Sequence, residues 1–413
     1  MKEQSEGPAK VTPGVEVFLQ DEVHLVQGKR VGLVTNPTGI DSRLESTIDL
    51  FARHPNIGLA ALFGPEHGVT GTAQAGEYVP EAFDSDYGFP IYSLYGQSEH
   101  AELEEPDDLD INMRLFDTQD RGKHLEHEML ENIDVLIFDL QDVGTRIFTY
   151  IATMIHCMKG CIATGIEFIV LDRPNPINGR AMEGPLLQYP EFSSFVGVYP
   201  IPVRYGLTLG ELASYFNSEY LDSEVRLNVI PMRGWGREMW FEDTGLPWIA
   251  PSPNMPTLDT VKVYPGQVYF EGTNVSEGRG TTLPFELFGA PWINGRDLAR
   301  KLNRFSMPGV TFREAAFQPV FSKFSGQACQ GCQIHVQEKD EFRPLETSLF
   351  ILQTIHEDYP DAFCFHSKYF DTIMGTNRVR TALLDKKPVG FIAQGFASDI
   401  KKFEGVRKPH LLY

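Results

Sequence analysis

Five short apolar runs near the start of this chain constrain its fold more than any other feature. Each run is nearly continuous in apolar character and rich in β-branched residues, which is typical of a strand buried on both faces of a parallel sheet. The runs cover Arg30–Thr35, Ile57–Phe63, Val135–Asp139, Phe168–Asp172 and Leu227–Pro231. Helical patterns alternate with them, at Leu44–His54, His124–Asn132, Arg146–Thr164 and Leu207–Leu221. This alternation predicts an α/β fold with a doubly wound, mainly parallel sheet.

The pattern changes at about Asn294, where the alternation of strands and helices ends. A chain of 413 residues is longer than one hydrophobic core usually serves. We therefore predict a larger domain at residues 1–290 and a smaller mixed α/β domain at residues 291–413. The Gly- and Pro-rich region 70–120 is expected to be an insertion over the edge of the sheet. The elements expected in the smaller domain are Asp297–Phe305, Leu345–Asp358 and Phe370–Leu384 as helices and Gln333–Val336 as a strand.

Residues 251–292 show neither a clear amphipathic helix nor the alternation of a strand. The segment has enough apolar bulk to be ordered, and long ordered loops are usually functional. It is rich in carboxylate, guanidinium, amide and aromatic groups, which bind sugars and small anions. We predict that it lies near the domain junction and contributes to a pocket.

A polar turn with Gly or Pro follows each predicted strand, and Asn36 opens the first of these turns. Ligands of open α/β sheets bind outside the carboxyl ends of the strands. Several side chains are therefore expected to converge on one rim and form a cleft. They are Glu66, His67, Asp139, Asp142, Arg146, Asp172, Arg173 and Asn175.

Glu66 is the best candidate for a catalytic acid, because it directly follows a buried strand in the sequence GPEHG. Glycoside hydrolysis uses two carboxyl groups, or one acid together with a group that orients an acetamide of the substrate. Asp139, Asp142 and Glu277 are the rival second carboxyls. Each of these groups also has a structural interpretation, in which it caps a turn or pairs with an arginine, and His67 is as compatible with a structural hydrogen bond as with catalysis.

Arginines at three positions offer paired donors for a carboxylate ligand, although ion pairing within the protein is the default role of any one of them. They are Arg146, Arg173 and Arg279. The formal net charge of −20 argues against a nucleic-acid partner and makes local arginines necessary for binding an anion.

Several functional classes lack their signatures. The sequence contains no GxGxxG, GxxxxGK[ST], HExxH or GxSxG motif. Five cysteines with a single CxxC, Cys329 to Cys332, do not make a disulfide framework or a complete zinc site. The N-terminus lacks the apolar core of a secretory signal, and no run reaches the ~18 apolar residues of a membrane span. The sequence as written predicts a cytoplasmic protein, or a secreted or periplasmic one if a leader was removed before this numbering.

The chain resembles the NamZ-type exo-β-N-acetylmuramidases, glycoside hydrolase family 171, formerly a domain of unknown function. The resemblance extends from residue 31 to residue 413. It rests on the segments VGLVTNPTGI, LFGPEHGVTGTAQAGE, VLIFDLQDVGTRIFTYI, VLDRPNPING, EGPLL, VYPIPVRYGLTLGELA, SPNMPTLDT, VYPGQVYFEGTNVSEGRGTTLPFE and the terminal LLY.

This resemblance implies a Rossmann-like catalytic domain, a smaller C-terminal domain that completes the cleft, and no cofactor. It implies that Glu66 is the catalytic glutamate of GPEHG and that N-acetylmuramic acid is released from the non-reducing ends of peptidoglycan fragments. The lactyl carboxylate of that sugar would explain arginines in the cleft, and Asn254 and Asn274 are plausible partners of its acetamide. Two alternatives remain open: another β-N-acetylhexosaminidase, such as a β-N-acetylglucosaminidase, and a non-catalytic protein that binds cell-wall fragments. The oligomeric state is unknown.

Overall fold

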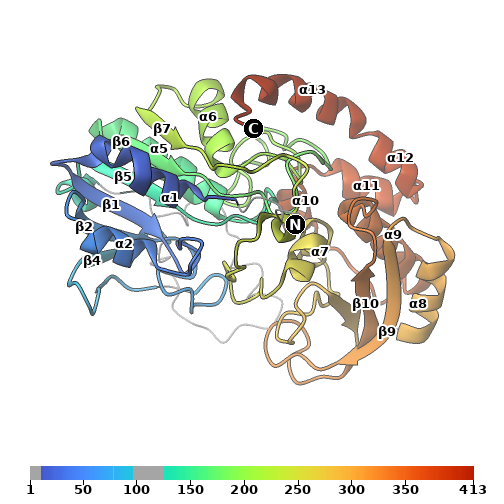
Figure 1. Cartoon of the computed structure of the whole chain (residues 1–413). Helices are drawn as coiled ribbons and strands as arrows, with labels where there is room; N and C mark the ends of the chain where they lie inside the picture. The colour runs from blue at the N-terminus through green and yellow to red at the C-terminus, as the bar shows by residue number, and fades with distance from the viewer. Residues whose placement is uncertain (1–10, 78, 96–124, 126) are drawn as a thin grey trace, which may run out of the picture.

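A computed structural model describes residues 11–77, 79–95, 125 and 127–413, and it contains two β-sheets (Figure 1). The larger sheet has the strand order β3-β4-β2-β1-β5-β6-β7, and all neighbours are parallel except β3 and β4. Counted along the chain, the parallel strands follow the order of the Rossmann fold. The strands are β1 (Arg30–Thr35), β2 (Gly58–Gly64), β3 (Ala82–Phe83), β4 (Pro90–Ser93), β5 (Val135–Asp139), β6 (Glu167–Leu171) and β7 (Leu227–Ile230).

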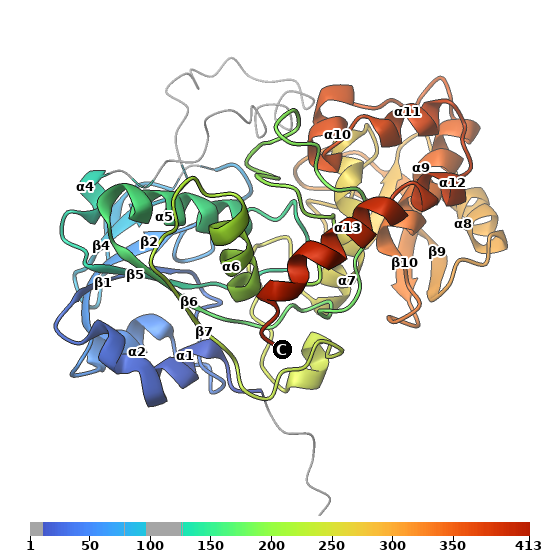
Figure 2. The ribbon, with the colours of Figure 1, turned by 90° about the horizontal axis from the view of Figure 1, so that it is seen from above.

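Helices cover both faces of this sheet (Figure 2). In β5, Val135 and Ile137 pack toward α1 and α2, whereas Leu136 and Phe138 join the core beneath α4 and α5. Alternate side chains of a strand point to opposite faces, so a strand covered on both faces needs apolar residues at every position. The helices are α1 (Gly14–Val17), α2 (Thr47–Arg53), α4 (His127–Leu130), α5 (Tyr150–Thr164) and α6 (Leu209–Glu219).

The smaller sheet is antiparallel, with β10 (Cys329–Val336) between β8 (Leu287–Ala290) and β9 (Val310–Phe317). The residues of β8 lie within the predicted first domain, but the strand is hydrogen-bonded to β10 and therefore belongs to the second sheet. The boundary after residue 290 stays a prediction. The helices of this half are α8 (Gly295–Arg304), α9 (Pro344–Asp358), α10 (Ser367–Met374), α11 (Arg378–Leu384), α12 (Val389–Gln394) and α13 (Ala397–Arg407).

The expectation of an α/β fold is confirmed, and the five predicted strands all form within one or two residues of their expected ends. The expectation that residues 251–292 form a loop without helices is wrong, because α7 spans Leu258–Gln267 and the short helix η4 spans Val268–Gly272. Helix α7 has no amphipathic pattern because it is buried on most sides and contains Pro265. A Cβ on Gly266 would lie 2.0 Å from the carbonyl oxygen of Pro344, so α7 packs directly on α9.

Other differences from the sequence prediction have local causes. The helix expected at Phe370–Leu384 is two helices, because Gly375 takes a φ of 74° and ends α10. The helix expected from Arg146 begins at Tyr150. Strand β9 escaped prediction because it is a partly exposed edge strand whose residues do not alternate cleanly. The region 70–120 was expected to lie over the sheet edge, but it contributes strands β3 and β4 to the sheet itself, and residues 78, 96–124 and 126 lie outside the described part of the chain.

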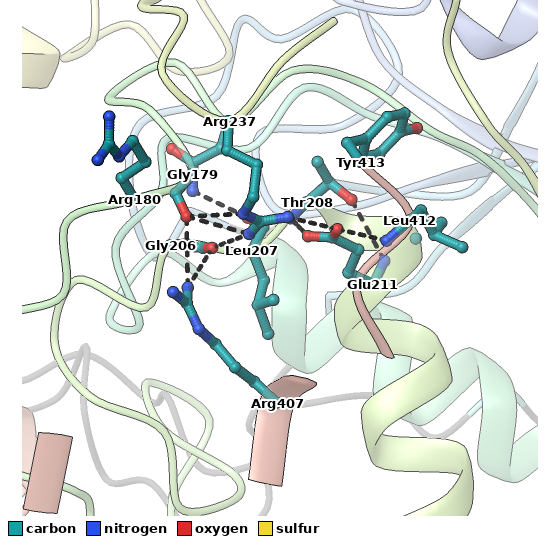
Figure 3. A network of polar contacts seen from close by, with 12 residues as sticks. Gly179, Arg180, Gly206, Leu207, Thr208, Glu211, Arg237, Arg407, Leu412 and Tyr413 are labelled. Atoms are coloured by element: carbon teal, nitrogen blue, oxygen red, sulfur yellow. Dashed lines mark hydrogen bonds and ion pairs between the residues drawn. The ribbon is translucent and has the colours of Figure 1, made fainter. Parts of the chain in front are cut away.

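The end of the chain is tied to the larger sheet through a polar network around Glu211 (Figure 3). Thr208 and Glu211 form the capping box that starts α6. The Oε1 atom of Glu211 also accepts from Arg237 Nη1 at 2.7 Å and from the backbone N–H of Leu412 at 2.8 Å. Arg407, the last residue of α13, donates to the carbonyl oxygen of Gly206 at 2.7 Å. These contacts hold the C-terminal helices against the carboxyl edge of β6 and β7.

The cysteines of the CxxC sequence lie three residues apart on β10 and therefore point to opposite faces of the strand. Burial raises the pKa of Cys329 to about 11 and that of Cys332 to about 12, so both stay as thiols at neutral pH. Among the described residues, no group of three or more His, Cys, Asp or Glu side chains is arranged to hold a metal ion. Within the same residues, no helix combines the length and apolar character that a membrane span requires.

Candidate active site

A small pocket, partly open to solvent, lies between the carboxyl end of β2 and the segment that contains α7 and η4. Segments far apart in the sequence form its wall. The lining residues are Glu66, His67, Ala75, Ile147, Phe148, Thr149, Val196, Ser252, Asn254, Met255, Tyr264, Glu271, Arg279 and Phe285.

Glu66 reaches the pocket because the chain turns sharply after β2. His67 and Gly68 both take a left-handed backbone conformation, with φ values of 75° and 76°. The backbone N–H of Gly68 closes the turn on the carbonyl oxygen of Pro65 at 2.9 Å. A non-glycine residue with positive φ is strained, and such strain concentrates at functional sites.

The two oxygens of Glu66 have different partners, which determines where a proton sits. Oε1 accepts from the backbone N–H of Gly76 at 3.0 Å, and Oε2 accepts from the hydroxyl of Thr149 at 2.7 Å. The amide N–H can only donate, so it always requires an acceptor at Oε1. The Thr149 hydroxyl can donate or accept. A proton on Glu66 therefore resides on Oε2, and Thr149 can bond the carboxyl group in both of its protonation states.

Arg279 and Glu271 form the opposite wall of the pocket. Glu271 Oε1 accepts from Arg279 Nε at 3.1 Å and from Nη2 at 2.7 Å, and its Oε2 accepts from the Tyr369 hydroxyl at 2.7 Å. Burial would lower the pKa of Arg279, but the charges of Glu271 and Glu277 outweigh burial and raise it. The guanidinium lies 4.9 Å over the ring of Phe285. Its hydrogen bonds within the described residues use Nε and Nη2, which leaves Nη1 for a ligand.

Two further predicted residues line the pocket. His67 contacts the carbonyl oxygen of Ala73 through Nδ1 at 2.8 Å, and Asn254 donates from Nδ2 to Gln74 Oε1 at 3.1 Å. Both contacts order the segment 73–76 that also carries the N–H bonded to Glu66. His67 and Asn254 therefore face the pocket and support its rim at the same time.

Asp139 and Arg173 lie away from this pocket and bind each other. Asp139 is fully buried, and its two oxygens accept from Arg173 Nε at 2.6 Å and Nη2 at 2.9 Å. Thr47 adds a hydroxyl donor to Asp139 Oδ2 at 2.6 Å. The pair sits where the strand order reverses, between β1 and β5. In the structure these residues join the ends of strands, and neither lines the pocket of Glu66.

Arg146 is also buried, and its partners are backbone carbonyl oxygens. Nη1 donates to Pro185 and Ile201 at 3.0 and 2.8 Å, and Nη2 donates to Ile373 and Met374 at 3.2 and 2.7 Å. Burial lowers its pKa. The guanidinium thus fastens two loops of the larger half to the end of α10 and is not among the residues that line the pocket.

Four other predicted residues are engaged within the protein outside the pocket lining. Asp172 accepts from Thr208, Gly210 and Tyr413, and Asn175 donates to the carbonyl oxygen of Leu207. Asn36 donates to the hydroxyl of Tyr150, which itself donates to the carbonyl oxygen of Pro251. Asn274 bonds the backbone at Ala362 and Cys364. Of the predicted site residues, the ones gathered at the pocket are Glu66, His67, Asn254 and Arg279.

Asp142 is buried outside the pocket lining, and its two oxygens differ in their hydrogen-bond partners among the described residues. Its Oδ2 accepts from the Gly144 N–H at 2.7 Å and from the Tyr205 hydroxyl, whereas Oδ1 has no hydrogen-bond partner among the described residues. Burial raises the pKa of Asp142 to about 7, against the opposing effect of these hydrogen bonds. In an unfolded chain an aspartate titrates near ~3.9. At a pH between these two pKa values, Asp142 is protonated in the folded protein and ionised in the unfolded chain.

We expect Asp142→Asn to be more favourable for stability at pH 8 than at pH 5. A folded-state pKa above the unfolded one makes stability fall as pH rises through this window, and asparagine removes that loss because it is always neutral. The variant minus wild-type difference in melting temperature should increase by about 2 °C or more between pH 5 and pH 8. A difference that is constant with pH would contradict a buried, protonated Asp142, and activity of the same variant tests the catalytic prediction for this residue.

Several pocket residues were not among the predicted catalytic and substrate-binding residues. Thr149 lies just before α5, Tyr264 lies within α7, and Glu271 lies within η4. Burial, followed by the charge of Glu271, raises the pKa of Tyr264 well above its usual range, so its phenol stays protonated. The density of polar and aromatic groups in residues 251–292 indicated the segment, but no spacing indicated which of its side chains reach Glu66.

Comparison with known proteins places this geometry in a family. The model described as "Exo-beta-N-acetylmuramidase NamZ, N-terminal" matches residues 31–125 and 121–259, and the corresponding C-terminal model matches residues 262–413. The chain belongs to the NamZ exo-β-N-acetylmuramidase family. Peptidoglycan β-N-acetylmuramidase NamZ of Bacillus subtilis (strain 168) is 45% identical over 413 residues, which are 100% of this chain and 94% of that protein.

Solved structures of the NamZ family, which is also named DUF1343, share the complete fold. One DUF1343 family protein of Bacteroides fragilis NCTC 9343 is 36% identical with a TM-score of 0.85, covering 98% of this chain and 99% of that one. A second from the same strain is 28% identical with a TM-score of 0.74 and the same coverage of 98% and 99%. The sequence prediction of a NamZ-type protein is thereby confirmed.

Proposed function

We propose that this protein is a peptidoglycan β-N-acetylmuramidase and that the pocket around Glu66 is its active site. One observation carries the proposal. A chain that matches the NamZ family from end to end places the glutamate of GPEHG in a pocket beside a second carboxylate and an arginine. Hydrolysis of a glycosidic bond requires an acid beside the leaving oxygen and a group that stabilises the developing positive charge on the sugar.

Glu66 is the proposed general acid. Its proton, held on Oε2 beside Thr149, passes to the glycosidic oxygen as the bond breaks. Once Glu66 is ionised, the Thr149 hydroxyl and the Gly76 N–H both donate to the carboxylate, as the structure has them. Glu271 is the carboxylate best placed to face the sugar from the opposite wall, because Asp139, Asp142 and Glu277 do not line the pocket.

Arg279 is proposed to bind the lactyl carboxylate of N-acetylmuramic acid through Nη1. A guanidinium is the preferred partner of a carboxylate, and on a protein of net charge −20 such an anion needs a local cation. Asn254 retains an amide oxygen for the N–H of the acetamide group. Phe148 and Phe285 add apolar surface to the pocket lining. The substrates are therefore peptidoglycan-derived saccharides that end in N-acetylmuramic acid, and a nucleic acid is not expected to bind.

Cleavage of two chromogenic substrates tests the proposed function. The protein should hydrolyse a β-N-acetylmuraminide at least about tenfold faster than the matching β-N-acetylglucosaminide, because only the former has a carboxylate to pair with Arg279. Equal rates would favour a general β-N-acetylhexosaminidase. Binding of the muraminide without turnover between pH 4 and pH 9 would favour a non-catalytic cell-wall-binding protein.

A further inference from the structure

Lys323, on the loop between β9 and β10, places a buried ammonium group next to Glu277, which lies close to Arg279 of the pocket wall. The side chain is 7% exposed. Its Nζ donates to the carbonyl oxygens of Phe270 and Val275 at 2.7 and 3.1 Å, and to Glu277 Oε2 at 3.0 Å. An ammonium group has three N–H donors, so this site satisfies Lys323 completely.

The residues on both sides of Lys323 have an uncommon backbone conformation. The neighbouring residues Ser322 and Phe324 are both in the left-handed region, with φ values of 66° and 59°. Such conformations are strained in non-glycine residues and persist only where the surrounding structure imposes them. The loop also rests on Gly280, where an added Cβ would lie 2.4 Å from the carbonyl oxygen of Phe321. The β9–β10 loop is therefore built against the turn that carries Arg279.

Lys323 reaches the pocket through a chain of alternating charges. Glu277 is 1% exposed, with Oε2 bonded to Lys323 and Oε1 3.7 Å from Arg279 Nε. Arg279 in turn bonds Glu271 at 2.7 Å, and Glu271 accepts from Tyr369. The cluster therefore contains two carboxylates and two cations, so that its net charge is zero. Without Lys323, Arg279 would be the remaining ion-pair partner of Glu277 among the described residues.

We propose that Lys323 is a positioning residue for substrate recognition. By neutralising Glu277, it keeps Arg279 on Glu271 at the pocket wall, with Nη1 available to the substrate carboxylate. Loss of Lys323 would let Glu277 draw the guanidinium away from Glu271. The inference rests on the proposed function, because it assigns Arg279 to the carboxylate of the sugar.

Kinetics of three variants on the chromogenic muraminide and glucosaminide test this role. Lys323→Met should raise KM for the muraminide about tenfold or more, with a smaller change in kcat, and should reduce the preference for the muraminide. Lys323→Met/Glu277→Gln should recover most of that loss, because it removes the charge that competes for Arg279. If Lys323→Met does not fold, Lys323→Gln, which is neutral but can still donate to the carbonyl oxygens, should give the same rise in KM.

The outcomes separate this inference from the proposed function. If the wild-type protein showed no preference for the muraminide over the glucosaminide, the result would contradict the proposed function itself. A selective wild type combined with an unchanged KM in a folded Lys323 variant would overturn the positioning role alone. Additive losses in Lys323→Met/Glu277→Gln, accompanied by lower melting temperatures, would assign Lys323 to stability of the loop and would likewise overturn it.

Discussion

Glu66→Gln lowers the turnover of a disaccharide that ends in N-acetylmuramic acid by about 10²–10⁴-fold, the usual cost of a missing general acid. Glutamine keeps the shape of the side chain. Its oxygen can accept from the Gly76 N–H and its amide can donate to the Thr149 hydroxyl, so the fold is retained. The variant lacks only the proton that the leaving oxygen requires.

Two further readouts make this result specific to an acid. The loss should be much smaller for a nitrophenyl glycoside, because nitrophenolate leaves without protonation. The basic limb of the pH–rate profile should disappear, since that limb reports ionisation of the acid. Glu131→Gln, an exposed carboxyl outside the pocket lining, is the matched control and should retain wild-type rates. A folded Glu66→Gln protein that cleaves the disaccharide within about threefold of the wild-type rate would end the assignment.

Arg173→Met destabilises the protein by about 3–5 kcal/mol, the typical cost of leaving one member of a buried ion pair alone. Asp139 is fully buried and receives two hydrogen bonds from Arg173, so its charge would have no compensating cation. The midpoint of urea unfolding should fall accordingly. Asp139→Asn/Arg173→Met should recover a large part of the stability, because asparagine is neutral and still accepts from the Thr47 hydroxyl.

The same pair separates a structural role from a ligand-binding one. If Arg173 bound the substrate carboxylate, Arg173→Met would unfold at the wild-type urea concentration and lose affinity for the muraminide. The structure supports the opposite result, with lower stability and an unchanged KM in the fraction that remains folded.

The central strands of the larger sheet could be predicted from the sequence because they are covered on both faces. In β5 every residue is buried, and the nearly continuous apolar run VLIFD predicts this burial. Helix α7 could not be predicted by the same reasoning, because a helix buried on most sides loses its polar face, and Pro265 is unusual within a helix. Edge strand β9 could not be predicted for the opposite reason. Too few of its residues are buried to produce an apolar pattern in the sequence.

The sequence predicted which residues lie at the carboxyl ends of the strands, but not which of them face the pocket and which pair within the protein. Glu66 and Arg173 both follow strands, and position alone does not distinguish them. Arg173 is bound by Asp139, 34 positions earlier in the chain, whereas Glu66 faces a wall contributed by Glu271 and Arg279. Lys323 was not anticipated because its partners are backbone carbonyl oxygens and a glutamate on a distant segment. Contacts between residues far apart in the chain produce no characteristic spacing in the sequence from which they could be predicted.

Incubation with two disaccharides of opposite order, followed by mass spectrometry of the products, tests the central claim most directly. One disaccharide carries N-acetylmuramic acid at the non-reducing end and N-acetylglucosamine at the reducing end, and the other has the reverse order. The protein should split only the first, releasing N-acetylmuramic acid. Cleavage of both at similar rates, or of the second alone, would contradict an exo-acting muramidase centred on Glu66 and Arg279.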